Sequence, residues 1–483
     1  MSMRIAESVG FYLILPFMYE MVGGFDIVHD PRDIAFYAGV LLASFSVLKI
    51  LTVMHWGILS DRIGRRPVVL IGLLGDLLTS ALFGVSKSFG WAMVARCMNG
   101  FFTSSSVVIR PILVEISDET NRARMMSYSP MVWQLGSMLG GAIGGLLANP
   151  VKKYPWLFGN SVLFREYPYL LPCLFGSAIS FVGLVVGFFF LEETLVVKPT
   201  TAPGSGSASE TTPLVSEAQS EEGRAQINAE TGELSRWDIL TPTVIRVLFT
   251  NTILCLAVGM HTQLYPIFAA TDVAVGGLGM DTQTIGITFM VCSGFALYTQ
   301  LVKYPREERK YGALDCYRRG LLWTAVFGAT LPLIASLEQY LGKPTGSNIV
   351  GSALEYVSPG RCLIWGLLLI EFYVRMYGDA LGSTSVNLIT ANVVPSKNYL
   401  GFITGLQKQL NSITFLLGPF LSGYLWSWSI KHSFPYPFNS HFVWVLSGAS
   451  LVVAWYMTRS IPDSVNVSAS DNNPTNASQE ETS

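Results

Sequence analysis

The stretch Gly57-Ile58-Leu59-Ser60-Asp61-Arg62-Ile63-Gly64-Arg65-Arg66 decides the fold of this chain. It is a short polar joint between two long apolar runs, at about 34–56 and 67–85. Two helices joined so tightly must be antiparallel neighbours. The three arginines place the joint in the cytoplasm, because short cytoplasmic loops of membrane proteins are rich in Lys and Arg. The stretch therefore predicts a helical hairpin in a membrane, with its loop on the cytoplasmic side.

The composition of the 483 residues also indicates a membrane protein. The chain is 50% hydrophobic and 13% charged, about half the charged fraction of a soluble domain. Its mean hydropathy is +0.43, and apolar runs of about twenty residues recur, which predicts helices that cross a bilayer. The net charge of −2 favours no nucleic-acid partner. The six cysteines have no metal-ligand spacing, so we predict neither a zinc site nor a disulfide framework, and no cofactor.

Twelve apolar runs predict an all-α membrane protein with twelve transmembrane helices in two six-helix halves. Residues 1–194 form the first half and residues 241–460 the second. Residues 195–240 and 461–483 are rich in Ser, Thr, Pro and Glu, which predicts a disordered cytoplasmic linker and tail. The expected spans are about 4–23, 34–56, 67–85, 91–115, 128–147, 169–191, 244–270, 283–302, 318–337, 361–381, 400–427 and 441–457.

An internal repeat supports the two halves. The stretch that begins at Arg96 aligns with the one that begins at Arg375, and one residue of slip then brings Gly140 onto Gly418. Pro419 follows Gly418, whereas Gly141 follows Gly140. Such spacing predicts two parallel copies of one six-helix unit.

Glycines in the fifth span repeat at i, i+4 and i+8, at Gly136, Gly140 and Gly144. They share one helical face, so we expect a neighbouring backbone to approach there closely.

Ionisable residues inside spans are costly and therefore mark function. Glu371, Arg375 and Asp379 lie at i, i+4 and i+8 in the tenth span, so Arg375 can pair with both acids. The trio is either a proton or substrate switch, because the Arg couples to the protonation of a buried acid, or a static ion-pair ladder between helices.

Other polar residues in the spans are candidates for proton coupling or for the substrate path. Lys49 is expected to pair with Glu7 across the first two spans. Asp76 is either functional or a hydrogen-bonded packing residue, and a single interior histidine is more often a packing group than a metal ligand. We predict no metal site. The candidates are Glu7, Asp76, Arg96, Asn99, His261 and Gln263.

The joint has the form Gly-x-Leu-Ser-Asp-Arg-x-Gly-Arg-Arg, which resembles the loop 2–3 signature of the major facilitator superfamily. Arg96-x-x-Asn99-Gly100 resembles the family's helix 4 signature. Arg4-x-Ala-Glu7 and the glycine series resemble the drug:proton antiporter branch, in which a longer apolar run precedes the Arg, so this chain is expected to begin inside its first helix. Gly276-Gly-Leu-Gly279 resembles zinc-induced facilitator-like proteins.

This resemblance implies proton-coupled antiport by alternating access. The expected action is export or vacuolar sequestration of small organic molecules or metal chelates. The partners would be a small-molecule substrate, protons and the lipid bilayer. The protein would be a monomer in the vacuolar or plasma membrane, with both termini in the cytoplasm.

The charged turn that carries Glu115 and Arg124 faces the same side as the joint, which gives the joint a role as a conformational latch. Asp61, Arg65 and Glu115 would form an ion-pair relay that closes the cytoplasmic side. The resemblance implies that Asp61 in addition meets the start of the eleventh span, near 400–401, where a helix N-terminus favours a carboxylate. The expected latch residues are Gly57, Asp61, Arg62, Gly64, Arg65, Arg66, Glu115 and Arg124.

Two other functions stay open. One is a uniporter or symporter of sugars or other nutrients, and the other is a non-transporting receptor or scaffold. An enzyme is disfavoured because nothing in the sequence assembles a nucleophile, a base and an oxyanion site. ATP-driven transport is disfavoured because no phosphate-binding Gly-rich loop is followed by Lys and Ser or Thr.

Overall fold

The computed structural model describes residues 2–103, 108–109, 112–113, 122–193, 240–341, 359–394, 400–432 and 435–466. The regular structure of these residues is helical. Six stretches of described helix are long and apolar enough to cross a membrane, and one of them, Thr282–Leu337, contains two successive spans. The predicted all-helical membrane fold is therefore confirmed.

The first half begins with a broken helix. α1 (Ser2–Tyr12) leads into the 3-10 turn η1 (Leu15–Phe17) and then into α2 (Met18–Gly23). Pro16 lies in the break, where its missing N–H interrupts the helical ladder. After η2 (Pro31–Asp33) the long helices of this half are α3 (Ile34–Ile63), α4 (Arg65–Gly84), α5 (Phe89–Phe102), α7 (Arg122–Leu147) and α11 (Leu170–Phe190).

Helix α3 is longer than the sequence predicts. It passes through Gly57, where we expected the polar joint to start, and ends at Ile63. Gly64 makes the turn alone, with a φ of 104° that side chains rarely adopt. The joint is tighter than expected because residues 58–63 suit a helix, and a single glycine reverses the chain.

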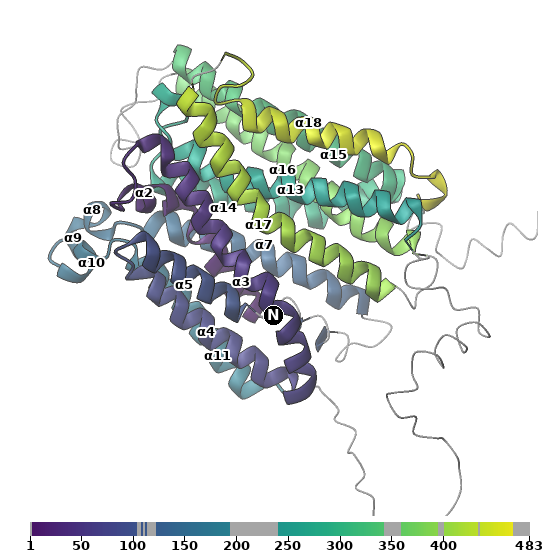
Figure 1. The fold of residues 1–483 in the computed structure, drawn as a ribbon, viewed down its shortest axis with the longest axis horizontal. Coiled ribbons are helices and arrows are strands. Elements are labelled where there is room, and N and C mark those ends of the chain that lie inside the picture. The colour runs from purple at the N-terminus through teal and green to yellow at the C-terminus, as the bar shows by residue number, and fades with distance from the viewer. Residues whose placement is uncertain are drawn as a thin grey trace, which may run out of the picture.

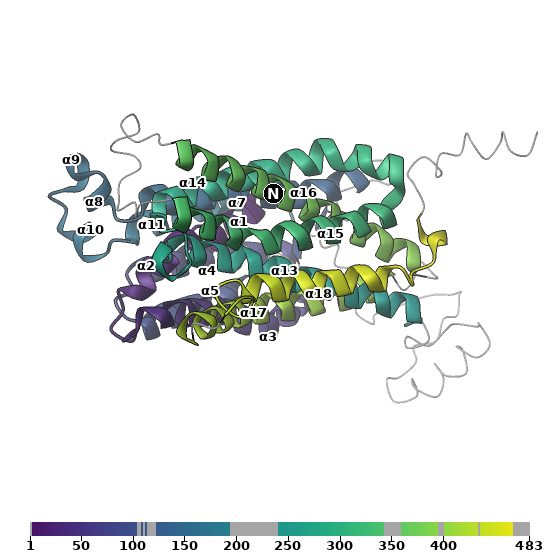
Figure 2. The ribbon, with the colours of Figure 1, turned by 90° about the horizontal axis from the view of Figure 1, so that it is seen from above.

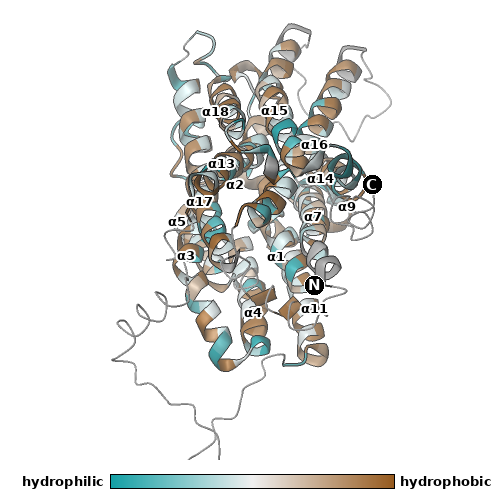
Figure 3. Cartoon of the chain, turned by 90° about the vertical axis from the view of Figure 1, so that its right-hand side faces the viewer, coloured by the Kyte–Doolittle hydropathy of each residue, from teal (hydrophilic) through white to brown (hydrophobic). Residues whose placement is uncertain are grey.

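The second half repeats this arrangement. Its elements are α13 (Pro242–Ala270), η3 (Val273–Val275), α14 (Thr282–Tyr298), η4 (Thr299–Lys303), α15 (Tyr304–Leu341), α16 (Pro359–Val393), α17 (Leu400–His432), α18 (Phe442–Thr458) and η6 (Asp463–Val465). Helices α13, α15, α16, α17 and α18 pack against one another, as α1, α3, α4, α5, α7 and α11 do in the first half. Figures 1 and 2 show the elements, and Figure 3 places α4 and α11 on one side of the bundle and α15 and α18 on the other.

Equivalent glycines in the two halves make equivalent packing contacts. A Cβ on Gly140 of α7 would lie 2.7 Å from the carbonyl oxygen of Val9 in α1. A Cβ on Gly418 of α17 would lie 3.4 Å from the backbone of Gly259 in α13. The fifth span thus packs on the first of its half, and the eleventh packs on the seventh, as the repeat implies.

The turns at the start of α4 and inside α15 also correspond. Gly312 in α15 has a φ of 78°, and the helix is kinked there. This kink corresponds to the turn at Gly64 in the first half. Glu193, beyond α11, accepts the N–H groups of Arg65 (2.8 Å) and Arg66 (3.1 Å) at the start of α4. Asn466, beyond α18, accepts the N–H of Leu314 at 2.8 Å. In each half, a side chain that follows the last helix thus caps the start of the third span, which is α4 in the first half and the part of α15 after Gly312 in the second.

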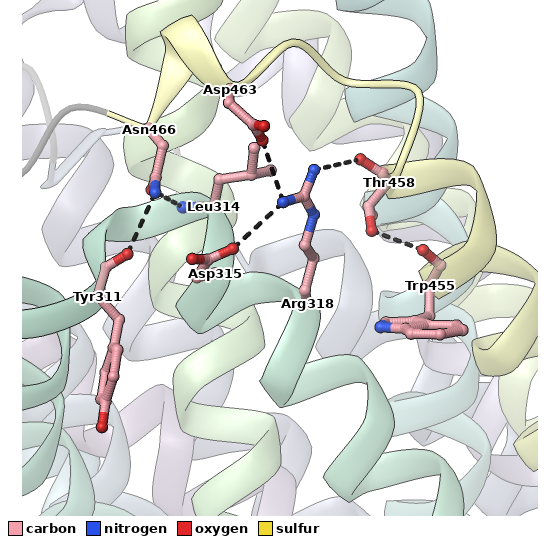
Figure 4. A network of polar contacts seen from close by, with 8 residues as sticks. All are labelled: Tyr311, Leu314, Asp315, Arg318, Trp455, Thr458, Asp463 and Asn466. Carbon is pink, nitrogen blue, oxygen red and sulfur yellow. Dashed lines mark hydrogen bonds and ion pairs between the residues drawn. The ribbon is translucent and has the colours of Figure 1, made fainter.

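Residues 459–466 are held against α15 by further contacts (Figure 4). The Asn466 amide donates to the carbonyl of Tyr311 at 3.1 Å. The Arg318 guanidinium pairs with Asp463 and Asp315, each at 3.2 Å, and donates to the carbonyl of Thr458 at 3.2 Å. The sequence places the start of the tail at residue 461, whereas residues 461–466 pack on α15. The rest of the predicted tail, and most of the predicted linker, lie outside the described residues.

The halves meet at one end of the bundle, which we call the outer end and which carries α2 and the short helices α8 (Pro150–Lys153), α9 (Pro155–Phe158) and α10 (Val162–Glu166) (Figure 1). The Ser427 hydroxyl donates to the carbonyl of Arg32 at 2.7 Å, and the Ser137 and Ser293 hydroxyls are 2.9 Å apart. We call the opposite end, with Gly64 and Gly312, the inner end. The observed polar and ring contacts between the halves involve residues 12–46 and Ser137 on the first-half side, in the outer portions of its helices.

Candidate functional site

The tenth span carries a buried ion pair that is poorly hydrogen-bonded. Glu371 and Arg375 of α16 are 2% and 3% exposed. The Arg375 Nε lies 3.6 Å from the Glu371 Oε1, outside ordinary hydrogen-bond distance, and neither carboxylate oxygen of Glu371 has a hydrogen-bond partner among the described residues. Such a pair is costly to bury and is sensitive to anything that changes the charge of either member.

Asp379 departs from the predicted ladder. It accepts a hydrogen bond from the Thr324 hydroxyl of α15 at 2.8 Å, whereas the observed ion pair of Arg375 is with Glu371. Asp379 lies one turn further along α16 than Arg375, next to the α15 surface.

The first half presents a charged cluster on α1 and α3. Glu7 accepts from Arg4 at 2.9 Å and from Lys49 at 3.4 Å, so the predicted pairing of Glu7 with Lys49 is found. The Arg4 guanidinium lies 4.3 Å from the ring centre of Trp133, and the Lys49 ammonium lies 5.2 Å from that of Phe45. Two cations share one carboxylate here, so the cluster has an excess positive charge in an aromatic setting.

Aromatic rings connect this cluster to the second half. Tyr12 packs edge-on against Trp133, with ring centres 6.1 Å apart, and against Phe289 of α14, at 6.3 Å. Tyr265 of α13 lies beside both Phe289 (5.7 Å) and Phe372 of α16 (5.0 Å). Glu371 and Arg375 are on the same helix as Phe372, so a chain of rings runs from the first-half cations to the second-half acids.

Arg96 and Asp76 belong to the interior of the first half. Arg96 is 1% exposed, and its guanidinium lies 4.9 Å from the ring centre of Phe45. Asp76 accepts from Asn99 at 2.9 Å and from Ser180. This geometry is that of a hydrogen-bonded packing group between α4, α5 and α11, which is the alternative to a role of Asp76 in transport.

His261 and Gln263 lie within the second half. The His261 ring stacks on Trp444 of α18 at 5.4 Å, and its Nε2 lies 2.6 Å from the Ser447 hydroxyl. Gln263 is 3% exposed. His261 is thus a hydrogen-bonded interior group, as one alternative has it. Within the described residues, no group of three or more His, Cys, Asp or Glu side chains is arranged to hold a metal ion.

The glycines of the fifth span face α1. A Cβ on Gly136 would lie 2.6 Å from that of Ser8, and a Cβ on Gly144 would overlap the carbonyl of Leu13. Pro419 performs a different task, because its carbonyl faces Gly39 of α3 in the other half.

The joint at Gly64 is tied to its own half in this structure. Asp61 pairs with Arg65 at 2.6 Å, its side chain is 64% exposed, and Arg62 is exposed beside it. Arg66 donates to the carbonyl of Phe188 in α11 at 2.5 Å. Glu115, and the side chains of Arg124 and of residues 400–401, lie outside the described residues. The relay from Asp61 to Glu115 and the contact with the eleventh span therefore stay predictions.

A cavity of about 780 Å³ lies at the outer end, lined by both halves. Glu20 of α2 stands in its wall and accepts hydrogen bonds from Asn149 at 2.5 Å and from Thr282 at 2.7 Å. Asn149 belongs to the first half and Thr282 to the second, so Glu20 joins them. A second link is the ion pair of Asp33 with Lys431, at 2.5 Å.

Several residues of this arrangement were not among the sequence candidates. Glu193 caps α4, although only its place after the sixth span, on the same side as the joint, could have suggested this. The rings of Tyr12, Trp133 and Phe289 bring the halves together, and aromatic residues are too common in apolar spans to stand out. Glu20 is an exposed acid at a span end, a position at which acids are ordinary.

Comparisons with known proteins agree with this architecture. A family model described as the Major Facilitator Superfamily matches residues 3–342. The chain is 29% identical to the Aspergillus fumigatus protein named major facilitator superfamily multidrug transporter mfsB, over 89% of this chain and 78% of that one. It is 28% identical to the Arabidopsis thaliana protein Zinc Induced Facilitator-Like 1, over 86% and 81% of the two chains. The solved structure of a D-xylose–proton symporter superposes with a TM-score of 0.69 at 13% identity, over 97% and 98% of the chains.

Proposed function

This chain belongs to the major facilitator superfamily, whose members are membrane transporters of small molecules and not enzymes, and we propose that it is a proton-coupled antiporter that works by alternating access. Its substrates would be small organic molecules or metal chelates, which it exports or sequesters in a vacuole. The names of the multidrug and zinc-induced relatives support this substrate class. We further propose that it acts as a monomer in the vacuolar or plasma membrane, with the inner end and both termini in the cytoplasm.

The observation that carries the proposal is the buried Glu371–Arg375 pair. The pair is desolvated and has little hydrogen-bond support, so adding a proton to Glu371 changes its energy strongly. Asp379 lies one turn away and is partly exposed. Asp379 would take the proton from water between the halves, and Arg375 would transmit the change of charge to Glu371.

Antiport follows if substrate and proton compete for these acids. A substrate with a cationic or hydrogen-bond-donating group would bind the ionised carboxylates of the second half. The cationic and aromatic cluster of Arg4, Lys49 and Trp133 would hold the opposite part of the molecule. Protonation of the acids would weaken the first interaction and release the substrate.

The structure corresponds, in this proposal, to a state closed at the outer end. The bonds of Glu20, Asp33 and Ser427 connect the halves there, while Asp61 at the inner end is exposed. The latch at the joint would then be disengaged, and it would engage when the inner end closes.

The decisive experiment measures flux in proteoliposomes with and without a proton gradient, across a panel of drugs and chelates. We expect the gradient to drive uptake by the native protein and Glu371→Gln to abolish the gradient effect while exchange of substrate without a gradient persists. Glu308→Gln is the matched control, because Glu308 is also a buried glutamate of the second half but lies near the inner end of α15. A flux that ignores the gradient for every compound would refute antiport.

Two other functions would give other results. A nutrient uniporter would equilibrate sugars with no gradient dependence. A receptor or scaffold would transport nothing, and Glu371→Gln and Arg96→Ala would leave its function intact while deletion of the linker abolished it. The fold similarity to a D-xylose–proton symporter shows a shared architecture and does not favour sugar as the substrate.

A further inference from the structure

The outer end carries a hairpin, residues 149–168, of which the transport cycle described above uses only Asn149, the partner of Glu20. It contains α8, α9 and α10 and connects α7 to α11. Its three basic residues, Lys152, Lys153 and Arg165, are an exception to the expectation that loops on this side are poor in Lys and Arg. Figures 1 and 2 both place the hairpin beyond the ends of the long helices.

The hairpin is a built element with a fixed base. At its neck the N–H of Asn149 donates to the carbonyl of Pro168 at 2.9 Å. Glu166 pairs with Lys87 in the loop between α4 and α5. Inside the hairpin, the rings of Phe158 and Phe164 meet edge to face at 5.2 Å. Its shape is therefore set by contacts of its own.

The hairpin also exposes four large apolar side chains. Trp156 is 81% exposed and Val162 is 73% exposed, with Leu157 and Leu163 at 59% and 50%. These four side chains come from α9 and α10, which also hold the two packed phenylalanines. Soluble surfaces rarely expose several large apolar side chains in one short segment, and an apolar patch of this kind marks a partner.

Charge and chain continuity identify the partner. The hairpin has three basic residues and one acidic residue, a net charge of +2, and Lys152 and Arg165 are both exposed, Lys152 at the rim of the outer cavity. The chain enters α11 at Leu170, and α11 exposes Leu174, Phe175, Phe181 and Val182, as a lipid-facing helix does. The patch is thus close in sequence to the lipid-facing surface. Trp together with basic side chains is the composition of segments that lie at the boundary between headgroups and acyl chains.

We propose that the hairpin 149–168 is an interfacial anchor that rests on the outer leaflet. Trp156, Leu157, Val162 and Leu163 enter the acyl boundary, and Lys152 and Arg165 contact lipid phosphates. The anchor acts on the contact between the halves, because Lys153 donates to the carbonyl of Gly145 at 2.7 Å and Gly145 packs against Gly286 of α14. Anionic lipid in this leaflet therefore holds the outer end of α7 at the membrane surface.

The test reads the depth of the hairpin in full-length protein in nanodiscs. Spin labels are placed singly at Leu157 and Val162 in a background in which the six cysteines are replaced and folding is checked by circular dichroism. Phe189, 73% exposed on α11, is the control in lipid, and Asp272, exposed in the outer loop after α13, is the control in water. We expect labels on the hairpin to collide with oxygen as the Phe189 label does. Collisions with a water-soluble nickel chelate, as at Asp272, would overturn the proposal.

Three further measurements test the assignment. The unmodified protein is treated with a lipid-soluble carbene reagent, and the peptide that contains Trp156 should be labelled as heavily as peptides of α11. The spin labels are also compared in nanodiscs that hold one or two copies of the protein. If two copies protect the labels from both oxygen and nickel and a single copy does not, the patch belongs to a contact with a second copy, and the lipid assignment is overturned. In the native protein, we expect the labels to lie deeper in membranes that contain phosphatidylglycerol than in phosphatidylcholine alone. The double variant Lys152→Glu, Arg165→Glu should lose this difference in depth. A depth unaffected by these changes would refute the phosphate contacts.

Discussion

A methyl group at the crossing of α7 and α14 should open the outer end. A Cβ added to Gly286 would lie 2.6 Å from the Cα of Gly145 and 2.7 Å from the carbonyl oxygen of Gly141. Carbon atoms prefer a separation of about 3.5–4.0 Å, so the two helices must part by roughly 1 Å. Backbone atoms on both sides leave no flexible side chain to move aside.

The cost falls on one conformation. Overpacking of this kind costs about 1–3 kcal/mol, and each 1.4 kcal/mol is about tenfold in an equilibrium constant. Because the crossing joins the two halves, the cost applies to the state that is closed at the outer end. Gly286→Ala should therefore shift the balance away from that state by roughly 5- to 150-fold.

The assay is a distance between spin labels on the two halves. Ile27 and Val275 are exposed at the outer end, one in each half, and double electron–electron resonance measures the distribution of distances between them. Gly286→Ala should move population to longer distances. The control is Gly294→Ala on the same helix, where a Cβ meets nothing within 4 Å. If the two variants give the same distribution, or if Gly286→Ala shortens the distance, the reasoning about outer closure is wrong.

Three further outcomes follow from the ends of the molecule. Asp61→Asn removes the ion pair with Arg65. If the joint is a latch for the inner end, this variant should raise the reactivity of cysteines placed on the inner faces of the helices. Unchanged reactivity would rule out the latch. Asn466→Ala removes the cap at the kink of α15 and should lower the free energy of unfolding by about 0.5–2 kcal/mol, as loss of a capping side chain does. Thermal unfolding in detergent measures this loss. The control is Asn466→Asp, because an aspartate can still accept the N–H of Leu314. Burial lowers the pKa of His441, whose Nε2 faces the Ser336 hydroxyl at 3.2 Å, so the folded protein favours the neutral form. The free energy of unfolding should therefore be highest above the ordinary His pKa and should fall as the pH drops below about 6.5. Hydrogen exchange at the start of α18 should become faster over the same pH range, and His441→Asn should remove this pH dependence.

Periodicity and composition sufficed to predict an all-helical membrane fold, because lipid permits few alternatives to a continuous helix. The ends of the spans were less well predicted, since α3 and α16 continue past the expected ends at 56 and 381. The joint also predicted the pairing of Asp61 with Arg65, which lie at the end of α3 and the start of α4, on either side of the turn at Gly64. The pair of Glu7 with Lys49 followed from two adjacent spans.

Contacts that depend on tertiary placement could not be predicted in this way. His261 faces Ser447 in α18, and nothing near His261 in the sequence shows which neighbour it meets. Asp379 faces Thr324 across a helix interface, although its spacing from Arg375 suggested a ladder. A polar side chain in a span has several faces available, and packing alone decides which one is used.

The break in the first span has a consequence for how the halves can move. α1 packs on α7 and α11 of its own half, whereas α2 touches α13, and Glu20 in α2 bonds to Thr282. The inner part of the first span, α1, thus belongs to the first half alone, whereas its outer part, α2, contacts both halves. Pro16 and the 3-10 turn separate these parts, so the first span is built as a flexure. Rocking of the halves can then be taken up as bending at Leu15–Phe17, and replacing this turn by a continuous helix would stiffen the whole molecule.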